Sequence, residues 1–172
     1  IGVSLSAKQE SMMRDAQSPY FEYDLLGILK GAFVEKVYVP ASDECLGIAD
    51  AVKLAEEAGA ILCYAYLGDV TDSVTGDKAA RRFEDGYLDE LAEFLSDSGV
   101  EGITYMPTRN TPGQLDRVRT LCDQYGFMQV SGEDINSPRQ SFVVHAMENP
   151  EFENLIESAW ELIRRENEAG AN

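Results

Sequence analysis

Hydrophobic and polar positions follow two different patterns along the chain. In the first third the apolar residues recur at helical spacing. They predict helices over residues 6–16, 23–33 and 42–58. We expect Ser42 to cap the third helix and Gly59 to end it. Residues 36–39 form a possible short strand. The pattern therefore predicts a mostly helical segment over residues 1–50.

From about residue 60, strand-like runs alternate with helical ones. Residues 60–67 form a continuous apolar run between Gly59 and Gly68, which is typical of a strand buried on both faces. Further strands are predicted at 103–106, 127–130 and 141–146. Helices are predicted up to about Ser98, from Thr111 to Tyr125, and after Asn149 and Pro150.

Two of these helices carry clear local signals. Thr111, with Pro112 at the first helical position and Gln114 at the third, forms a capping box. The last helix is amphipathic, and Glu161 and Arg165 on its wet side are a favourable pair four residues apart.

The alternation indicates an α/β fold. Strands joined by short loops and helices are parallel neighbours, and parallel sheets place ligands at the carboxyl ends of their strands. We therefore predict two parts, a helical segment at 1–50 and a βα-repeat region at 51–172 with a C-terminal helix.

The net charge of the chain argues against two classes of binding partner. The chain has 172 residues and a formal net charge of −17, with a pI near 4.3. This charge argues against nucleic acid and against an anionic membrane surface, which both attract clustered Lys and Arg. No apolar run reaches the roughly 18 residues of a membrane helix, and the first residues lack signal-peptide features. Three widely spaced cysteines fit reduced thiols, so we expect a cytoplasmic protein.

Because the chain does not begin with Met, we expect it to be a piece of a longer protein.

Polar side chains gather where the predicted strands end. They are Asp69 after the first strand, Arg109 after the second, and Glu133, Asp134, Asn136 and Arg139 after the third. Carboxylates can hold a divalent cation, while the cation and guanidinium groups grip a phosphate. The alternative is that these residues form no site, because charged residues are common in surface loops. A second alternative is cation binding by Asp69, Asp72 and Asp77, although their spacing does not fit an EF-hand.

Other catalytic signals are weak. The single histidine, His145, lies on an apolar run. We interpret it as a core or edge-strand histidine in preference to a metal ligand. The chain has no G-x-S-x-G, Walker or G-x-G-x-x-G motif.

Three segments resemble the later part of a PHP domain, the polymerase and histidinol phosphatase superfamily. Residues 49–68 resemble the family's helix, small-residue turn and strand that ends in His-Pro. Residues 102–115 resemble the next strand and its Pro-capped helix. Residues 125–136 resemble the final strand, which in the family ends in a Gly-Ser-Asp-x-His type of motif. The region of resemblance, from about residue 51 to residue 146, is a little over half of the chain, and the first 50 residues resemble a helical insertion found in some members.

The resemblance implies the C-terminal portion of a distorted (β/α)7 barrel that binds zinc, manganese or iron and hydrolyses phosphoesters. Asp134 falls on the family's last metal aspartate, whereas Asn136 and Tyr66 fall where the family usually has His. All three are therefore candidate ligands of a metal centre that we expect to be incomplete in this chain. Arg109 and Arg139 would bind the phosphate of a small metabolite or nucleotide, and Asp69 would be a ligand or general base.

The departures from His favour an alternative, a degenerate, non-catalytic domain that binds or scaffolds. The resemblance also implies a missing N-terminal half of the same chain as a partner. We expect self-association, because part of a barrel leaves a strand edge uncovered.

Overall fold

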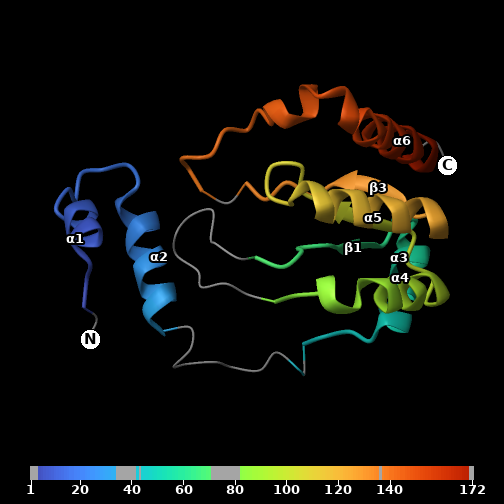
Figure 1. Cartoon of the computed structure of the whole chain (residues 1–172), viewed down its shortest axis with the longest axis horizontal. Helices are drawn as coiled ribbons and strands as arrows, with labels where there is room; N and C mark the ends of the chain where they lie inside the picture. Colours follow the sequence, from blue (N-terminus) through green and yellow to red (C-terminus); the bar gives the residue numbers. More distant parts are fainter. Residues whose placement is uncertain (1–3, 34–41, 43, 71–81, 136, 171–172) are drawn as a thin grey trace. The chain divides into compact units, whose positions relative to one another are not determined.

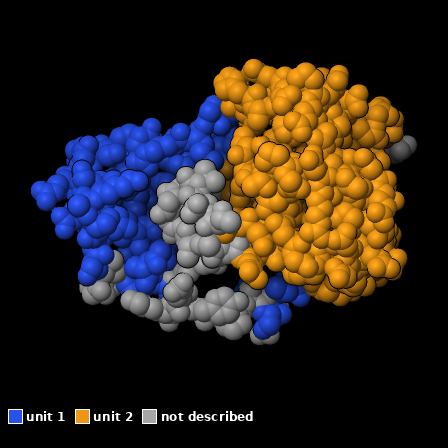
Figure 2. Space-filling view, in the orientation of Figure 1, with its two compact units in different colours: residues 1–45, 75–78, 135–142 blue, residues 46–74, 79–134, 143–172 orange. Residues whose placement is uncertain are grey.

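A computed structural model describes the chain except for residues 1–3, 34–41, 43, 71–81, 136 and 171–172. The chain divides into two compact units, coloured separately in Figure 2. Unit 1 comprises residues 1–45, 75–78 and 135–142, and unit 2 comprises residues 46–74, 79–134 and 143–172.

Unit 1 contains two helices, α1 (Ala7–Met13) and α2 (Phe21–Phe33), which confirm the helices predicted there. Ser6 caps α1 and forms a capping box with Gln9. Residues 36–39, predicted as a strand, lie outside the described residues.

Unit 2 is built on an open, three-stranded parallel sheet in the order β1–β2–β3 (Figure 1). Its strands are β1 (Cys63–Ala65), β2 (Gly102–Tyr105) and β3 (Met128–Ser131). Its helices are α3 (Ile48–Ala58), α4 (Leu88–Asp97), α5 (Pro112–Tyr125) and α6 (Glu153–Gly170). The predicted mixture of helices with parallel strands is confirmed, and the capping box of Thr111 and Gln114 begins α5 as expected.

The core of unit 2 lies between the sheet and the helices. The helix α5 packs on β2 and β3, α6 packs on β3, and α4 packs beside α5. Tyr105, Val118, Cys122 and Leu155 are almost completely buried there. Gly102 is needed where β2 starts, since a Cβ atom would lie 2.7 Å from Cys63 Sγ and 2.8 Å from Met128 O. The close approach of the three strands therefore depends on this glycine.

Three predicted elements differ from the structure. The third helix begins at Ile48 after Gly47, so the prediction that Ser42 caps it is wrong. Only Cys63–Ala65 of the run 60–67 pairs as a strand, and these residues are half-buried or exposed. The expected burial of this strand on both faces is therefore wrong, and in the described sheet β1 pairs with β2 alone.

The strand predicted at 141–146 is also absent from the described sheet. Residues His145–Glu148 form a 3-10 turn instead, and Phe142 is 89% exposed. An apolar run becomes a strand only when a neighbouring strand pairs with it. The final helix is confirmed: Asn149 caps a short turn, Pro150–Phe152, that leads into α6, and Arg165 Nε lies 2.9 Å from Glu161 Oε1. Among the described helices, none has both the length and the apolar composition needed to span a bilayer.

Candidate functional site

The carboxyl ends of the three strands lie at one edge of the sheet, because all three strands run parallel. We call the segments 66–69, 106–110 and 132–134 the carboxyl-end edge; all belong to unit 2. This edge is where a ligand of a parallel sheet would bind.

Asn110 joins the ends of β1 and β2. Its side chain is buried with 7% of the residue exposed. Its Oδ1 accepts a 2.8 Å hydrogen bond from the Met106 amide, and its Nδ2 donates a 2.9 Å bond to the Leu67 carbonyl. The amide thus satisfies one backbone group from each strand end and fixes their spacing.

Glu133 joins the ends of β3 and β2 in the same way. Its two carboxylate oxygens accept hydrogen bonds from the Thr108 amide at 2.8 Å and from the Thr108 hydroxyl at 2.5 Å. Glu133, which the sequence places among the candidate polar residues, therefore acts as a brace within the edge.

The Asp85 carboxylate accepts three hydrogen bonds near the carboxyl end of β1. Tyr66 donates its hydroxyl to Asp85 Oδ1 at 2.6 Å. The Asp69 amide and Gln114 Nε2 donate to Asp85 Oδ2 at 2.9 Å and 2.7 Å. Both oxygens of the carboxylate are therefore occupied, and Arg117 donates to the Asp85 carbonyl at 2.5 Å.

These contacts fix the charges of Tyr66 and Asp85. Burial, and then the hydrogen bond to Asp85 and its charge, raise the pKa of Tyr66 far above the ordinary value. Burial would raise the pKa of Asp85 as well, but the bonds from Gln114, Tyr66 and the Asp69 amide hold it below the ordinary value. The pair is thus a neutral phenol that donates to an ionised carboxylate.

The loop that follows β1 is held by a second carboxylate. Glu84 is 2% exposed, and its Oε1 accepts bonds from the Leu67 amide at 2.7 Å and the Gly68 amide at 3.4 Å. Asp69 Oδ1 accepts a 2.7 Å bond from the Phe83 amide, and the Asp69 carbonyl accepts one from Gln114 at 2.9 Å. The candidate base Asp69 is therefore anchored by its backbone and by one of its carboxylate oxygens.

Gly68 permits this close packing. Its φ is +70°, and a Cβ atom would lie 2.7 Å from Gln114 Nε2 and 2.9 Å from Asn110 Nδ2. Both its conformation and its surroundings therefore favour glycine.

The other candidate residues lie in different surroundings. Arg109 is half-buried after β2, and its guanidinium makes no hydrogen bond or ion pair with a residue that the structure describes. Asp134 is exposed and follows β3. Asn136 lies outside the described residues.

Arg139 belongs to unit 1, where it is already engaged. Its guanidinium donates to both carboxylate oxygens of Asp24, at 2.6 Å and 2.7 Å, and lies 4.3 Å from the centre of the Tyr20 ring. Asp24 has a side chain that is only 4% exposed. A phosphate bound by Arg139 would have to displace this carboxylate.

The histidine and the two described cysteines discussed next supply no reactive group to the carboxyl-end edge. His145 is exposed in a 3-10 turn, so it is neither a core histidine nor one on an edge strand, and its Nδ1 lies 2.8 Å from Glu148 Oε1. Cys122 is buried as expected, and burial raises the pKa of its thiol to about 12, which keeps it protonated. Cys63 is half-buried, and burial raises the pKa of its thiol too.

The donor set of the edge fits the implied metal ions only in part. Tyr66 does not fit, because its buried phenol keeps its proton and donates it to Asp85. Asp134 has the chemistry of a ligand for a hard cation, an exposed carboxylate. Among the described residues, no group of three or more His, Cys, Asp or Glu side chains could hold an ion.

Glu84 and Asp85 are the residues that sequence reasoning missed. They stand just before α4 and were interpreted only as part of a helix. A signal was present, since two adjacent acidic residues precede an apolar helix without capping it. Their partners, however, are backbone amides and side chains from 16 or more residues away, which a local pattern cannot reveal.

Comparison of the chain with models of protein families, with curated protein sequences and with solved structures gives no match. The resemblance to PHP domains therefore remains a prediction from the sequence.

Proposed function

We propose that this chain is the C-terminal portion of a PHP-type, metal-dependent phosphoesterase. The three parallel strands would then be part of a distorted (β/α)7 barrel. The observation that carries the proposal is the carboxyl-end edge itself, where Asn110 and Glu133 brace the three strand ends. Beside them lie Arg109, which has no partner among the described residues, and the exposed Asp134. These hydrogen bonds hold the loops that carry Arg109 and Asp134. Binding of a phosphoester requires groups that are positioned in this way.

Arg109 is the side chain that we assign to the phosphate. It is half-buried, and its guanidinium has no described partner to give up, whereas Arg139 is held by Asp24. Guanidinium groups bind phosphate through two parallel N–H donors, and the effect is stronger where solvent is partly excluded. The charge of −17 favours a small phosphorylated metabolite or nucleotide over a nucleic acid.

Asp134 is the residue that we assign to the metal, with Asn136 as a second ligand and Asp69 as ligand or base. Bound zinc, manganese or iron would supply a Lewis acid and an activated water. The remaining ligands would come from outside the described residues. Three thiols without a disulfide agree with a cytoplasmic location, which we also propose.

A second candidate is a non-catalytic binding or scaffolding domain. The Tyr66–Asp85 hydrogen bond favours it, because it fills with a structural contact the position where the family has a metal-binding histidine.

Hydrolysis of an aryl phosphate with added manganese tests the proposal on the protein at its natural length. We expect metal-dependent turnover, loss of that turnover in Asp134→Ala, and a raised KM in Arg109→Ala. Arg82→Ala is the matched control, since Arg82 is exposed and equally unpaired among the described residues. Stoichiometric metal without turnover would support the binding domain, and turnover unaffected by either substitution would refute the assigned residues.

A further inference from the structure

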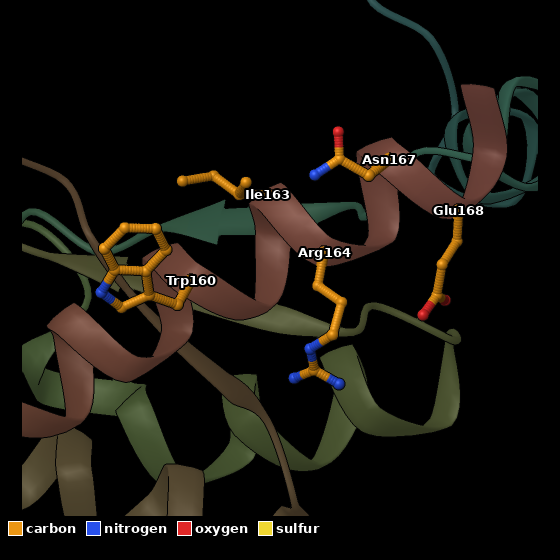
Figure 3. A pocket seen from close by; sticks show the side chains of 5 residues that line it. All are labelled: Trp160, Ile163, Arg164, Asn167 and Glu168. Atoms are coloured by element: carbon orange, nitrogen blue, oxygen red, sulfur yellow. The ribbon is translucent and has the colours of Figure 1, made fainter. Parts of the chain in front are cut away.

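The outward side of α6 carries an apolar stripe. Trp160 is 66% exposed, Ile163 46% and Ile156 42%. Figure 3 shows Trp160, Ile163 and Asn167 along one side of the helix, bordering a shallow hollow that Arg164 and Glu168 also line. We call Ile156, Trp160, Ile163 and Asn167 the α6 seam.

The spacing of the seam is that of a coiled coil. Its members are four, three and four residues apart, which is the a and d pattern of two heptads. The stripe is therefore patterned for another helix.

The seam is separate from the side of α6 that holds the helix in unit 2. Leu155 is 1% exposed and belongs to the core, with α6 packed on β3. Substitutions in the seam should therefore leave the fold of unit 2 intact.

Charges beside the seam indicate what covers it. Glu157 and Arg164 occupy equivalent flanking positions, one in each heptad, and within one copy Arg164 is paired with Glu161 of the same helix. A carboxylate of the other copy would share or replace that surface pair, which contributes little to stability. When two α6 helices lie antiparallel, Trp160 of each copy meets Ile163 of the other, and Glu157 of each copy meets Arg164 of the other. The helix is thus complementary to itself in this orientation. In a parallel pair Arg164 would instead face Ala159, which offers it no charge.

We propose that two copies of this chain associate antiparallel through the α6 seam. The seam is short, so the buried area falls at or below the roughly 1,200 Å² of weak, reversible complexes. The charge of −17 on each copy opposes association over long distances, and salt screens that repulsion. Association therefore strengthens as sodium chloride is raised.

Sedimentation velocity and tryptophan fluorescence test the proposal on the whole chain. Trp160 is the single tryptophan, so its emission reports on the seam alone. As protein or salt concentration rises, we expect a dimer to form, the emission to move to shorter wavelengths, and acrylamide quenching to fall. Trp160→Ala and Ile163→Gln should remove the dimer, whereas Phe94→Ala, which changes another exposed aromatic residue, on α4, should not.

A charge exchange tests the antiparallel register. Arg164→Glu places two like charges together and should weaken the dimer about tenfold, since both symmetry-related pairs are lost. Adding Glu157→Arg should restore it. Helix content measured by circular dichroism must stay constant across the variants. A chain that stays monomeric at every concentration, a dimer that survives Trp160→Ala and Ile163→Gln, or a double variant that does not recover would overturn the proposal.

Discussion

The Tyr66 hydroxyl donates a 2.6 Å hydrogen bond to the carboxylate of Asp85, 19 residues further along the chain. Tyr66 is 1% exposed and Asp85 is half-buried, so water cannot readily replace the carboxylate as the partner of the phenol. The contact ties the end of β1 to the turn that begins α4 and keeps the phenol neutral.

Tyr66→Phe should therefore destabilise unit 2 by about 1.5–3 kcal/mol, the usual contribution of a hydrogen bond to a charged group. Urea unfolding monitored by circular dichroism measures the change. Tyr87→Phe is the matched control, because Tyr87 is exposed and lies beside the same turn. Equal effects of the two substitutions would show that the hydrogen bond contributes nothing.

Gly68→Ala should destabilise the chain more than Gly59→Ala. Both glycines have positive φ, +70° and +64°, so both substitutions carry a backbone cost of about 1–2 kcal/mol. Only at Gly68 does the new Cβ also meet Gln114 and Asn110, whereas nothing lies within 4 Å at Gly59. Thermal unfolding of the two variants isolates the steric part. A Gly68→Ala variant no less stable than Gly59→Ala would contradict the close packing described here.

Asn110→Ala should open the connection between β1 and β2. The substitution leaves the Met106 amide and the Leu67 carbonyl without their partner, which costs about 1–3 kcal/mol for each group that water cannot reach. Hydrogen exchange at the Met106 amide measures the effect locally. Gln124→Ala, at an exposed position of α5, is the control that should leave that amide protected. Unchanged exchange in Asn110→Ala would rule out the brace.

The Asp24–Arg139 pair should make unit 1 sensitive to acid. The hydrogen bonds and charge of Arg139 hold the pKa of Asp24 below its ordinary value of 3.8, although burial acts in the other direction. The stabilisation is therefore complete above pH 3.8 and is lost as pH falls through the lower pKa of the folded state. The Tyr20 ring, which lies under Arg139, reports this in an NMR titration. A midpoint above 3.8, or the same titration in Asp24→Asn, would contradict the pairing.

Local signals predicted the local parts of this structure. The capping box of Thr111 and Gln114, the stop at Gly59 and the Glu161–Arg165 pair involve residues at most four positions apart, so the sequence alone reveals them. The parallel strands were also predictable from a pattern along the chain, because helical segments alternate with short apolar runs.

Contacts between distant residues account for what the sequence did not predict. Arg139 meets Asp24 across 115 positions, so the pattern around Arg139 offered no reason to expect an ion pair in place of a phosphate site. The apolar run at 141–146 has the composition of a strand, but the described sheet gives it no neighbour. The carboxylates that organise the β1 end, Glu84 and Asp85, were hidden because their partners lie on other elements.

We assign metal binding to Asp134 and a purely structural hydrogen bond to Tyr66. Titration of the protein at its natural length with manganese, followed by calorimetry, separates the two. Asp134→Ala should abolish or strongly weaken manganese binding, whereas Tyr66→Phe and the exposed control Asp116→Ala should bind manganese as the unsubstituted protein does. Manganese binding that survives Asp134→Ala but disappears in Tyr66→Phe would contradict both assignments.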